Sequence, residues 1–271
     1  MDKDPEISVI SACYNHGKYI NEMLESVLNQ SFQDFEVIII NDGSNDDTRD
    51  ILKKITHEKV RIIHTRNNGP AFARNLAIEN ARGQIIMNLD ADDKIAPSLL
   101  EKAFNVFCTN SQIGIVYCDA ECFGVKTGKF EIGEYTLESM LSDNRIISLA
   151  FFRKKDWESV GGYSGELIYG LEDWDFWLLI IELGRDVVKI PEKLVYYRIY
   201  KNPDDCRSGR RKKDRMKSIR SLVTIFHRHK RLYSDYPSVL HHFSHLEKKL
   251  NTENFLLRQI KNFCYNNLRK N

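Results

Sequence analysis

Apolar and polar positions alternate in blocks along the first hundred residues. Four short segments are predicted to be strands, at 7–12, 35–40, 60–64 and 85–89, and the β-branched run at 35–40 is typical of a strand that is covered on both faces. Between them, apolar residues recur with the spacing of amphipathic helices, over 19–29, 48–55 and 71–81. Strands that alternate with helices build parallel βαβ units. The pattern therefore predicts an α/β fold with a mostly parallel, doubly wound sheet flanked by helices.

The rest of the chain follows a less regular pattern. Short apolar segments predict further strands, at 113–119, 122–125, 129–132, 146–152, 186–190 and 194–200. An aromatic and acidic helix is predicted over 172–183, and helical spacing resumes from Ser208, with an interruption near Pro237. We therefore expect an α/β domain over residues 1–200 and a helical C-terminal extension over residues 201–271.

Polar loops follow three of the first four predicted strands. Their sequences are CYNHG after the first strand, NDGSND after the second and DADD after the fourth. Parallel strands direct their carboxyl ends to the same edge of a sheet, which is where open α/β sheets bind their ligands. These acidic or polar loops are therefore expected to converge on one site.

The composition is typical of a soluble globular chain. Of the 271 residues, 42% are apolar and 29% are charged, which excludes disordered, collagen-like and low-complexity proteins. The longest apolar runs are far shorter than the roughly 18 residues that span a bilayer, and the N-terminus lacks the apolar segment of a secretory signal. The six cysteines are therefore expected to be reduced thiols of a cytoplasmic protein, and their spacing does not indicate a zinc site.

Charge is distributed unevenly along the chain. The formal net charge is +2, but residues 201–271 contain 18 Lys or Arg and 6 Asp or Glu, a net charge of +12. The first 200 residues therefore carry a net charge of −10. An acidic body with a basic C-terminal part indicates a partner of some kind.

The strongest local signal is Asp90-Ala91-Asp92-Asp93, at the end of the fourth predicted strand. Three carboxylates within four residues repel one another, and a divalent cation among them would relieve that repulsion. Oxygen ligands suit Mg²⁺ or Mn²⁺, and magnesium sites typically combine one or two carboxylates with substrate phosphates. The alternative is an Asp-rich loop that caps the helix beginning near Pro97.

Two further positions have both a structural and a functional interpretation. Asp42 directly follows a buried strand, where it could contact a ligand or form an Asx-turn or helix N-cap. Arg74 lies in the first turns of a predicted helix, where its guanidinium and the helix N-terminus could bind phosphate. A surface salt bridge explains Arg74 equally well.

A second acidic cluster is Glu172-Asp173-Trp174-Asp175. On a helix, Glu172 and Asp175 share a face, whereas Asp173 points elsewhere. A carboxylate beside aromatic surface can have its pKa raised and act as a general base. Acidic residues in the first turn of a helix are also favourable because they interact with the helix dipole.

In combination, these motifs resemble the family 2 inverting glycosyltransferases, which have the Rossmann-like GT-A fold. The matching segments occur in the family's order: SVISACYNHGKYI, FEVIIINDGSNDDT, NNGPAFARNLAI, IIMNLDADD, VGGY and LEDWDFWL. The resemblance covers residues 6–200, whereas residues 201–271 contain no motif of the family. It implies a transferase that uses a nucleotide-sugar donor, usually a UDP-sugar, with Mn²⁺ or Mg²⁺ as cofactor.

The resemblance also implies roles for individual residues. Nucleotide binding would fall to Ala12, Tyr14, Asp42, Arg74 and Asp90. Asp42 would hydrogen-bond the base, and Asp92 and Asp93 would bind the metal. Asp173 matches the catalytic base, and Glu172 would lie beside the acceptor. In such a mechanism the cation stabilises the departing diphosphate, while the base removes the proton of the acceptor hydroxyl and in-line attack inverts the configuration.

The sequence departs from the family pattern at three points. Family members often have Tyr-Arg-x-His where this chain has Tyr197-Arg198-Ile199-Tyr200, so a histidine ligand is absent or replaced. An arginine that often follows the Glu-Asp pair has no counterpart at 178–180. The Gln-x-x-Arg-Trp signature of processive polymerases is missing as well, which favours an enzyme that adds single sugars.

The partner of the basic C-terminal part is left open. Apolar residues with helical spacing form a stripe, at Ile219, Leu222, Val223 and Phe226. Such a helix could pack on the catalytic domain with a solvated basic face, or it could lie on an anionic membrane surface. Nucleic acid is disfavoured because no known nucleic-acid-binding module accompanies the charge. The last predicted helix could pack internally or form a homodimer.

The whole sequence thus predicts a metal-dependent, inverting glycosyltransferase of surface polysaccharide synthesis, in the cytoplasm or at the cytoplasmic membrane face. Its acceptor would be a saccharide or a lipid-linked saccharide. A nucleotidyltransferase is one alternative, but CYNHGKY is a poor substitute for the glycine-rich activating loop that it needs. A GT-A module that binds nucleotide without transfer is the other alternative, and the intact Asp173 argues against it.

Overall fold

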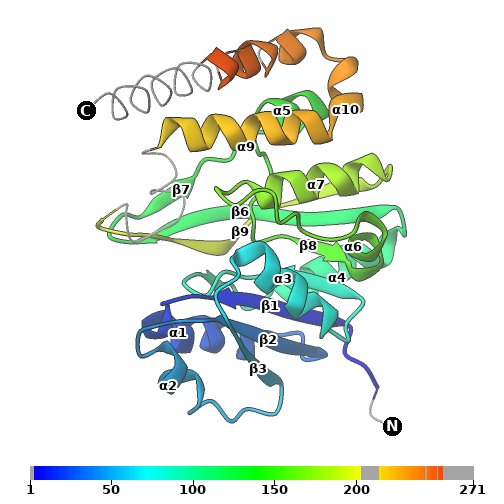
Figure 1. The fold of residues 1–271 in the computed structure, drawn as a ribbon. Coiled ribbons are helices and arrows are strands. Elements are labelled where there is room, and N and C mark those ends of the chain that lie inside the picture. The colour runs from blue at the N-terminus through cyan, green and yellow to red at the C-terminus, as the bar shows by residue number, and fades with distance from the viewer. Residues whose placement is uncertain (1–2, 203–213, 242, 249, 253–271) are drawn as a thin grey trace, which may run out of the picture.

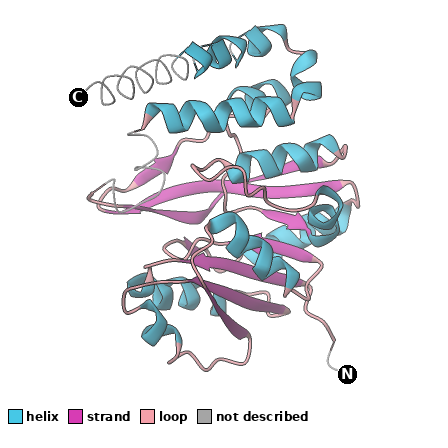
Figure 2. Cartoon of the chain, viewed as in Figure 1, coloured by secondary structure: helices cyan, strands magenta, loops and turns pink. Residues whose placement is uncertain are grey.

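The computed structural model describes residues 3–202, 214–241, 243–248 and 250–252. Within the first hundred residues, strands and helices alternate as the apolar pattern predicts (Figures 1 and 2). In chain order the elements are β1 (Ile7–Cys13), α1 (Gly17–Leu28), β2 (Phe35–Asp42), α2 (Thr48–Leu52), β3 (Val60–Thr65), α3 (Pro70–Glu79), β4 (Ile85–Asn88), β5 (Lys94–Ile95) and α4 (Leu99–Thr109). The two-residue strand β5 is not predicted by the sequence pattern.

The second half contains fewer and longer strands than the pattern predicts. Its elements are β6 (Ile113–Gly124), β7 (Gly128–Phe130), α5 (Leu137–Ser142), β8 (Phe151–Arg153), α6 (Lys154–Val160), α7 (Glu172–Glu182), β9 (Asp186–Ile199), α9 (Arg215–Arg228) and α10 (Lys230–Ser234). The strands predicted at 113–119 and 122–125 form one strand, β6, and those predicted at 186–190 and 194–200 form β9. Much of the predicted last helix and the segment 203–213 lie outside the described residues.

Two of these differences have a clear physical reason. In the β6–β9 ladder, Ile190 pairs with Cys118 and Lys193 pairs with Asp119, so positions 191 and 192 are skipped. Pro191 has no N–H to donate, and a bulge lets the strand continue past it. The strand predicted at 146–152 is wrong over 146–150, which is irregular and largely buried. Residues 146–150 are mostly apolar because they are buried, and not because they form a strand.

The strands form one mixed sheet in the order β3-β2-β1-β4-β8-β6-β9-β5, with β7 paired to β6. Parallel pairing joins β3, β2, β1 and β4, and it also joins β6 to β9, whereas β8, β5 and β7 pair antiparallel with their neighbours. The chain builds outward from β1 through β2 to β3 and then returns to place β4 on the other side of β1. That reversal is a topological switch point, and it opens a crevice at the carboxyl ends of β1 and β4.

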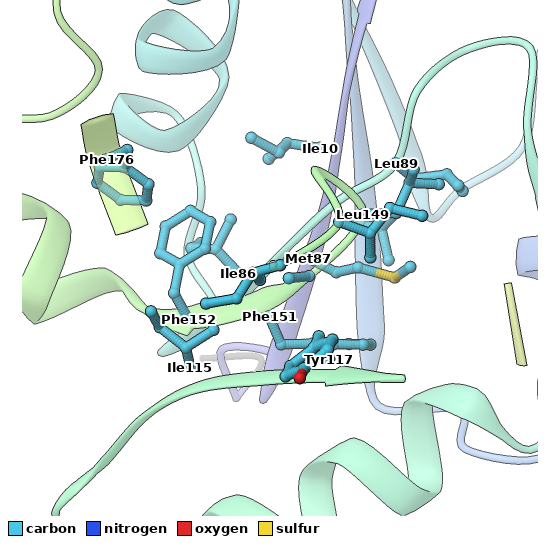
Figure 3. Close-up of a cluster of buried hydrophobic side chains, with 14 of the residues drawn as sticks. Ile10, Ile86, Met87, Leu89, Ile115, Tyr117, Leu149, Phe151, Phe152 and Phe176 are labelled. Carbon is cyan, nitrogen blue, oxygen red and sulfur yellow. The ribbon is translucent and has the colours of Figure 1, made fainter. Parts of the chain in front are cut away.

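The sheet is held by a continuous apolar core. All eight residues of β2 are buried, including the apolar run at 37–40 that predicts a strand covered on both faces. Around the middle of the sheet, side chains of β1, β4, β6 and β8 pack together, among them Ile10, Ile86, Ile115 and Phe152 (Figure 3). This dense packing fixes the strand ends that carry the polar loops.

The C-terminal helix α9 lies over α7 (Figure 1). Apolar side chains of α9 are buried and join the core of the α/β sheet, at Ile225 and Phe226. Charged groups add to the contact, because the Nε of Arg228 donates to the Oδ1 of Asp175 in α7 at 2.6 Å. No helix among the described residues is long and apolar enough to cross a membrane.

Candidate active site

A cavity of about 420 Å³ opens at the carboxyl edge of the sheet. The loops after β1, β2 and β4 line it together with the start of α7. All the residues that the sequence singles out for chemistry line this cavity: Ala12, Tyr14, Asp42, Arg74, Asp90, Asp92, Asp93, Glu172 and Asp173. The expected convergence of the polar loops is therefore present.

Asp42 is buried at the end of β2, with a relative exposure of 4%. Its two carboxylate oxygens accept hydrogen bonds from the backbone N–H groups of Asn68 and Gly69, both at 2.9 Å. The carboxylate thus holds the loop that leads into α3 against the end of β2. Gly43 makes this close approach feasible, because it has a φ of +70° and a Cβ there would lie 2.4 Å from the backbone nitrogen of Asn67.

Arg74 is a buried bridge and not a surface salt bridge. Its guanidinium donates to the Oδ1 of Asp90 at 3.1 Å and to the Oε1 of Glu172 at 2.7 Å, while its Nε donates to the Oδ1 of Asn88 at 3.1 Å. Burial opposes the charged form, but the two carboxylates raise the pKa of Arg74 above its ordinary value. Arg74 also lies against the ring face of Tyr163. It therefore joins α3, the end of β4 and the start of α7.

The acidic loop after β4 directs its carboxylates in different directions. Asp90 faces Arg74 and also accepts from the hydroxyl of Ser148 at 3.3 Å. Asp92 accepts a hydrogen bond from the hydroxyl of Tyr200. Asp93 is 2% exposed, and its Oδ1 accepts from the backbone N–H of Arg198 at 2.7 Å, so that it fixes the end of β9.

The donor set of this loop fits a hard divalent cation. Burial raises the pKa of Asp92 and of Asp93, and neighbouring carboxylates contribute to the rise in both. A cation beside them would offset both the lost hydration and the repulsion. No group of three His, Cys, Asp or Glu side chains within the described part of the chain is arranged to hold a metal. Magnesium sites with one or two carboxylates are completed by substrate phosphates and water.

His16 and Tyr200 also belong to this site, although the sequence patterns assigned no role to His16 and marked Tyr200 only as the residue at the position of the family's histidine. The Nδ1 of His16 lies 3.9 Å from the Oδ1 of Asp92, and the His16 and Tyr200 rings stack with their centroids 6.4 Å apart. Tyr200 occupies the position of the missing histidine, and its hydroxyl takes up the Asp92 contact. His16 could have been found, because it lies in the loop that follows the first predicted strand.

The part of the cavity lining at the start of α7 begins with a constrained turn. Leu171 immediately precedes α7 in the left-handed conformation, with a φ of +76°, which is strained for a residue with a side chain. Glu172 is buried, whereas Asp173 is partly exposed to the cavity, and its Oδ2 accepts from the amide of Asn144 at 3.0 Å. The turn therefore presents Asp173 to the cavity and Glu172 to Arg74.

Asp175 has a different role, although it lies only two residues further along. It is fully buried, and its Oδ1 contacts both the Nε of Arg228 and the Nε2 of His229, at 2.6 and 3.0 Å. The Nδ1 of His229 lies 3.2 Å from the Oε2 of Glu182. Asp175 thus fastens the C-terminal helices to the helix that carries Asp173.

Solved structures that are similar to this chain identify the class of its fold. S. aureus TarS in complex with UDP aligns with a TM-score of 0.62 and 21% identity, over 82% of this chain and 65% of that chain. The mannosyltransferase PcManGT from Pyrobaculum calidifontis, in complex with GDP-Man and Mn²⁺, aligns with a TM-score of 0.66 and 20% identity, over 92% and 70%. The fold is that of the GT-A glycosyltransferases, as the sequence predicts.

The chain belongs to glycosyl transferase family 2, whose family model matches residues 8–160. It is 32% identical to the Escherichia coli chondroitin synthase over 206 residues, which are 73% of this chain and 29% of that protein. It is also 32% identical to an uncharacterized glycosyltransferase of Methanocaldococcus jannaschii over 242 residues, 83% of this chain and 80% of that one. The chain thus spans less than a third of the chondroitin synthase that it resembles.

Proposed function

We propose that this chain is a metal-dependent, inverting glycosyltransferase that transfers a sugar from a UDP-sugar to a saccharide or lipid-linked saccharide acceptor. One observation carries the proposal: the acidic loop after β4 and the partly exposed carboxylate of Asp173 line a single cavity. Similarity to chondroitin and hyaluronan synthases supports a place in polysaccharide synthesis. The complexes of TarS with UDP and with UDP-GlcNAc support the choice of donor.

The nucleotide would lie across the ends of β1 and β2. The Tyr14 ring is exposed at the cavity, where it can stack on a base. Each oxygen of Asp42 already accepts one backbone N–H and keeps a second lone pair, which can accept the N3–H of uracil. Ala12 also lines the cavity and leaves room for the base because its side chain is small.

Asp92 and Asp93 would hold the cation, with His16 close to the Asp92 carboxylate. A bound Mn²⁺ or Mg²⁺ supplies positive charge that stabilises the diphosphate as it leaves. The hydroxyl of Tyr200 orients the Asp92 carboxylate, and the backbone N–H of Arg198 holds Asp93. Arg74 fixes Asp90 and is itself neutralised by Asp90 and Glu172. In this proposal Arg74 contributes to the nucleotide site by holding the Asp90 and Glu172 side chains in position.

Asp173 would act as the general base. The amide of Asn144 donates to one of its oxygens and so orients the carboxylate toward the cavity. An acceptor hydroxyl between Asp173 and the donor sugar would pass its proton to Asp173 and attack the anomeric carbon from the side opposite the diphosphate. Such a displacement inverts the configuration. Glu172, held by Arg74, would border the acceptor.

Nucleotide release tests this proposal directly. Purified protein is incubated with a panel of UDP- and GDP-sugars, with Mn²⁺ or with EDTA, and the free nucleoside diphosphate is measured. We expect metal-dependent release of UDP from at least one donor, at a rate that rises when a saccharide acceptor is added. Asp92→Asn should lower this rate, whereas Asp50→Asn, an exposed carboxylate on α2, should not. Binding of UDP without release from any donor would instead favour the nucleotide-binding module.

A further inference from the structure

A second cavity, of about 470 Å³, lies between α9 and the loop that leads into α7. Part of its wall is apolar, formed by Ile168 of the loop, Val223 of α9 and Leu250. Ile168 is 67% exposed, an unusual position for a large aliphatic side chain. Tyr169 lines both this cavity and the candidate active site. The two cavities therefore adjoin a few residues before Asp173.

Polar groups of α9 also face this second cavity. Arg220 is exposed and has no hydrogen bond or ion pair with the described residues. Arg228 is held through its Nε by Asp175, and its Nη1 lies 3.7 Å from Glu166, whose side chain is 70% exposed. Another side chain at the cavity, His227, has its Nε2 2.7 Å from the Oε1 of Glu247. Arg220 is therefore the cation that is most available to a ligand.

Ser221 gives an independent indication of a ligand. It is 2% exposed and lines the second cavity, yet its hydroxyl has no hydrogen-bond partner among the described residues. A buried hydroxyl without a partner costs free energy, so such groups are normally satisfied. A ligand oxygen in the cavity would supply the missing partner.

We propose that the second cavity binds the carrier end of the acceptor, an apolar chain joined to a phosphate. This inference rests on the proposed function, and it specifies the acceptor as lipid-linked. The apolar wall suits a hydrocarbon chain, and an arginine matches a phosphate through its forked donors. The hydroxyl of Ser221 adds a donor. The acceptor sugar would then extend past Tyr169 toward Asp173.

Calorimetric titration with a soluble prenyl phosphate tests the inference without any donor. The probes are geranyl phosphate, geraniol and inorganic phosphate, which separate the two halves of the expected ligand. We expect geranyl phosphate to bind at least tenfold more tightly than either of the others. Equal affinity for geraniol and geranyl phosphate, or no saturable binding of geranyl phosphate, would overturn the proposal. So would tighter binding of a hyaluronan tetrasaccharide, which has carboxylates but no apolar chain.

Substitutions on the cavity wall localise the binding. Arg220→Glu and Ile168→Asp replace exposed side chains, so the fold should tolerate them, and each should weaken geranyl phosphate binding at least tenfold. Arg231→Glu makes the same charge change on the exposed surface of α10 and should leave the affinity within twofold. UDP affinity should be unchanged in all three variants. Wild-type affinity for geranyl phosphate in Arg220→Glu would refute the assignment of the cavity.

The failure of this inference differs from the failure of the proposed function. Donor-dependent release of UDP together with no binding of geranyl phosphate would leave the transferase intact and exclude the lipid-phosphate cavity. Binding of geranyl phosphate that depends on Arg220, with no nucleotide release from any donor, would support the cavity and exclude the transferase.

Discussion

The buried Arg74 bridge allows a quantitative prediction for Arg74→Lys. The guanidinium directs three nitrogens at three acceptors, on Asn88, Asp90 and Glu172. A lysine ammonium at the end of a flexible chain cannot reproduce this planar fork, so at least two of these bonds are lost. Hydrogen bonds to charged groups contribute about 1.5–3 kcal/mol each, and breaking a buried pair costs about 3–5 kcal/mol. We therefore expect Arg74→Lys to lower the free energy of unfolding by about 3–5 kcal/mol.

Thermal and denaturant unfolding, followed by circular dichroism, measure this loss. For a domain of this size, about 3–5 kcal/mol corresponds to a decrease in the melting temperature of roughly 6 to 20 °C. Arg82→Lys is a matched control, because the Arg82 side chain is half exposed and its Nε makes one contact, at 3.2 Å, with the Glu36 carboxylate. That change should cost less than about 1 kcal/mol. A melting temperature of Arg74→Lys within about 2 °C of the wild type would refute the buried-bridge argument.

Three further predictions concern the base, the nucleotide loop and the docking of the C-terminal helices. Asp173→Asn should reduce acceptor transfer by about 10² to 10⁴ while UDP affinity changes only a few-fold, and Asp235→Asn, on the exposed surface, should transfer normally. Full transfer by Asp173→Asn would exclude it as the base. Gly43→Ala should push away the loop that Asp42 holds, so calorimetry should show weaker UDP binding, and an unchanged affinity would contradict this packing. Burial alone would lower the pKa of His229, but hydrogen bonds to Asp175 and Glu182 raise it in the folded state. Its stabilising contribution is therefore complete below the unfolded pKa of about 6.5 and is lost as the pH rises through the folded pKa. The difference in unfolding free energy between wild type and His229→Asn should shrink between pH 6 and pH 9, and a difference that does not vary with pH would contradict the pairing.

The docking of α9 on α7 joins the part of the chain without family motifs to the candidate base. Asp175 receives Arg228 and His229 from the C-terminal helices, two residues beyond Asp173 on the same helix. A change that loosens this contact is expected to reach the orientation of the first turn of α7, where Leu171 is already strained. The basic C-terminal part of the chain is therefore connected to the candidate site through the contacts of Arg228 and His229 with α7.

The sequence by itself determined the α/β alternation and most members of the site, but not His16. The strand β2 carries the continuous apolar run 37–40 because it is covered on both faces, and burial of this kind can be recognised from the residue types alone. Likewise, the acidic loop follows a buried strand, and parallel strands deliver their carboxyl ends to one edge whatever their order in the sheet. Local pattern and topology therefore predicted that Asp42 and Asp92 meet at one edge, whereas Asp173 was assigned to the site by the family resemblance.

Only the tertiary structure decided what each of these side chains contacts. Arg74 and Glu172 are 98 positions apart, and sequence spacing cannot predict a contact over that separation. The contact between Tyr200 and Asp92 could not be predicted for the same reason. Likewise, helical periodicity put Glu172 and Asp175 on one face, yet Glu172 turns to Arg74 and Asp175 to His229. The reason is physical: a buried charge is satisfied by whichever partner the packing of distant elements brings within hydrogen-bond distance, and that packing is set by the whole core.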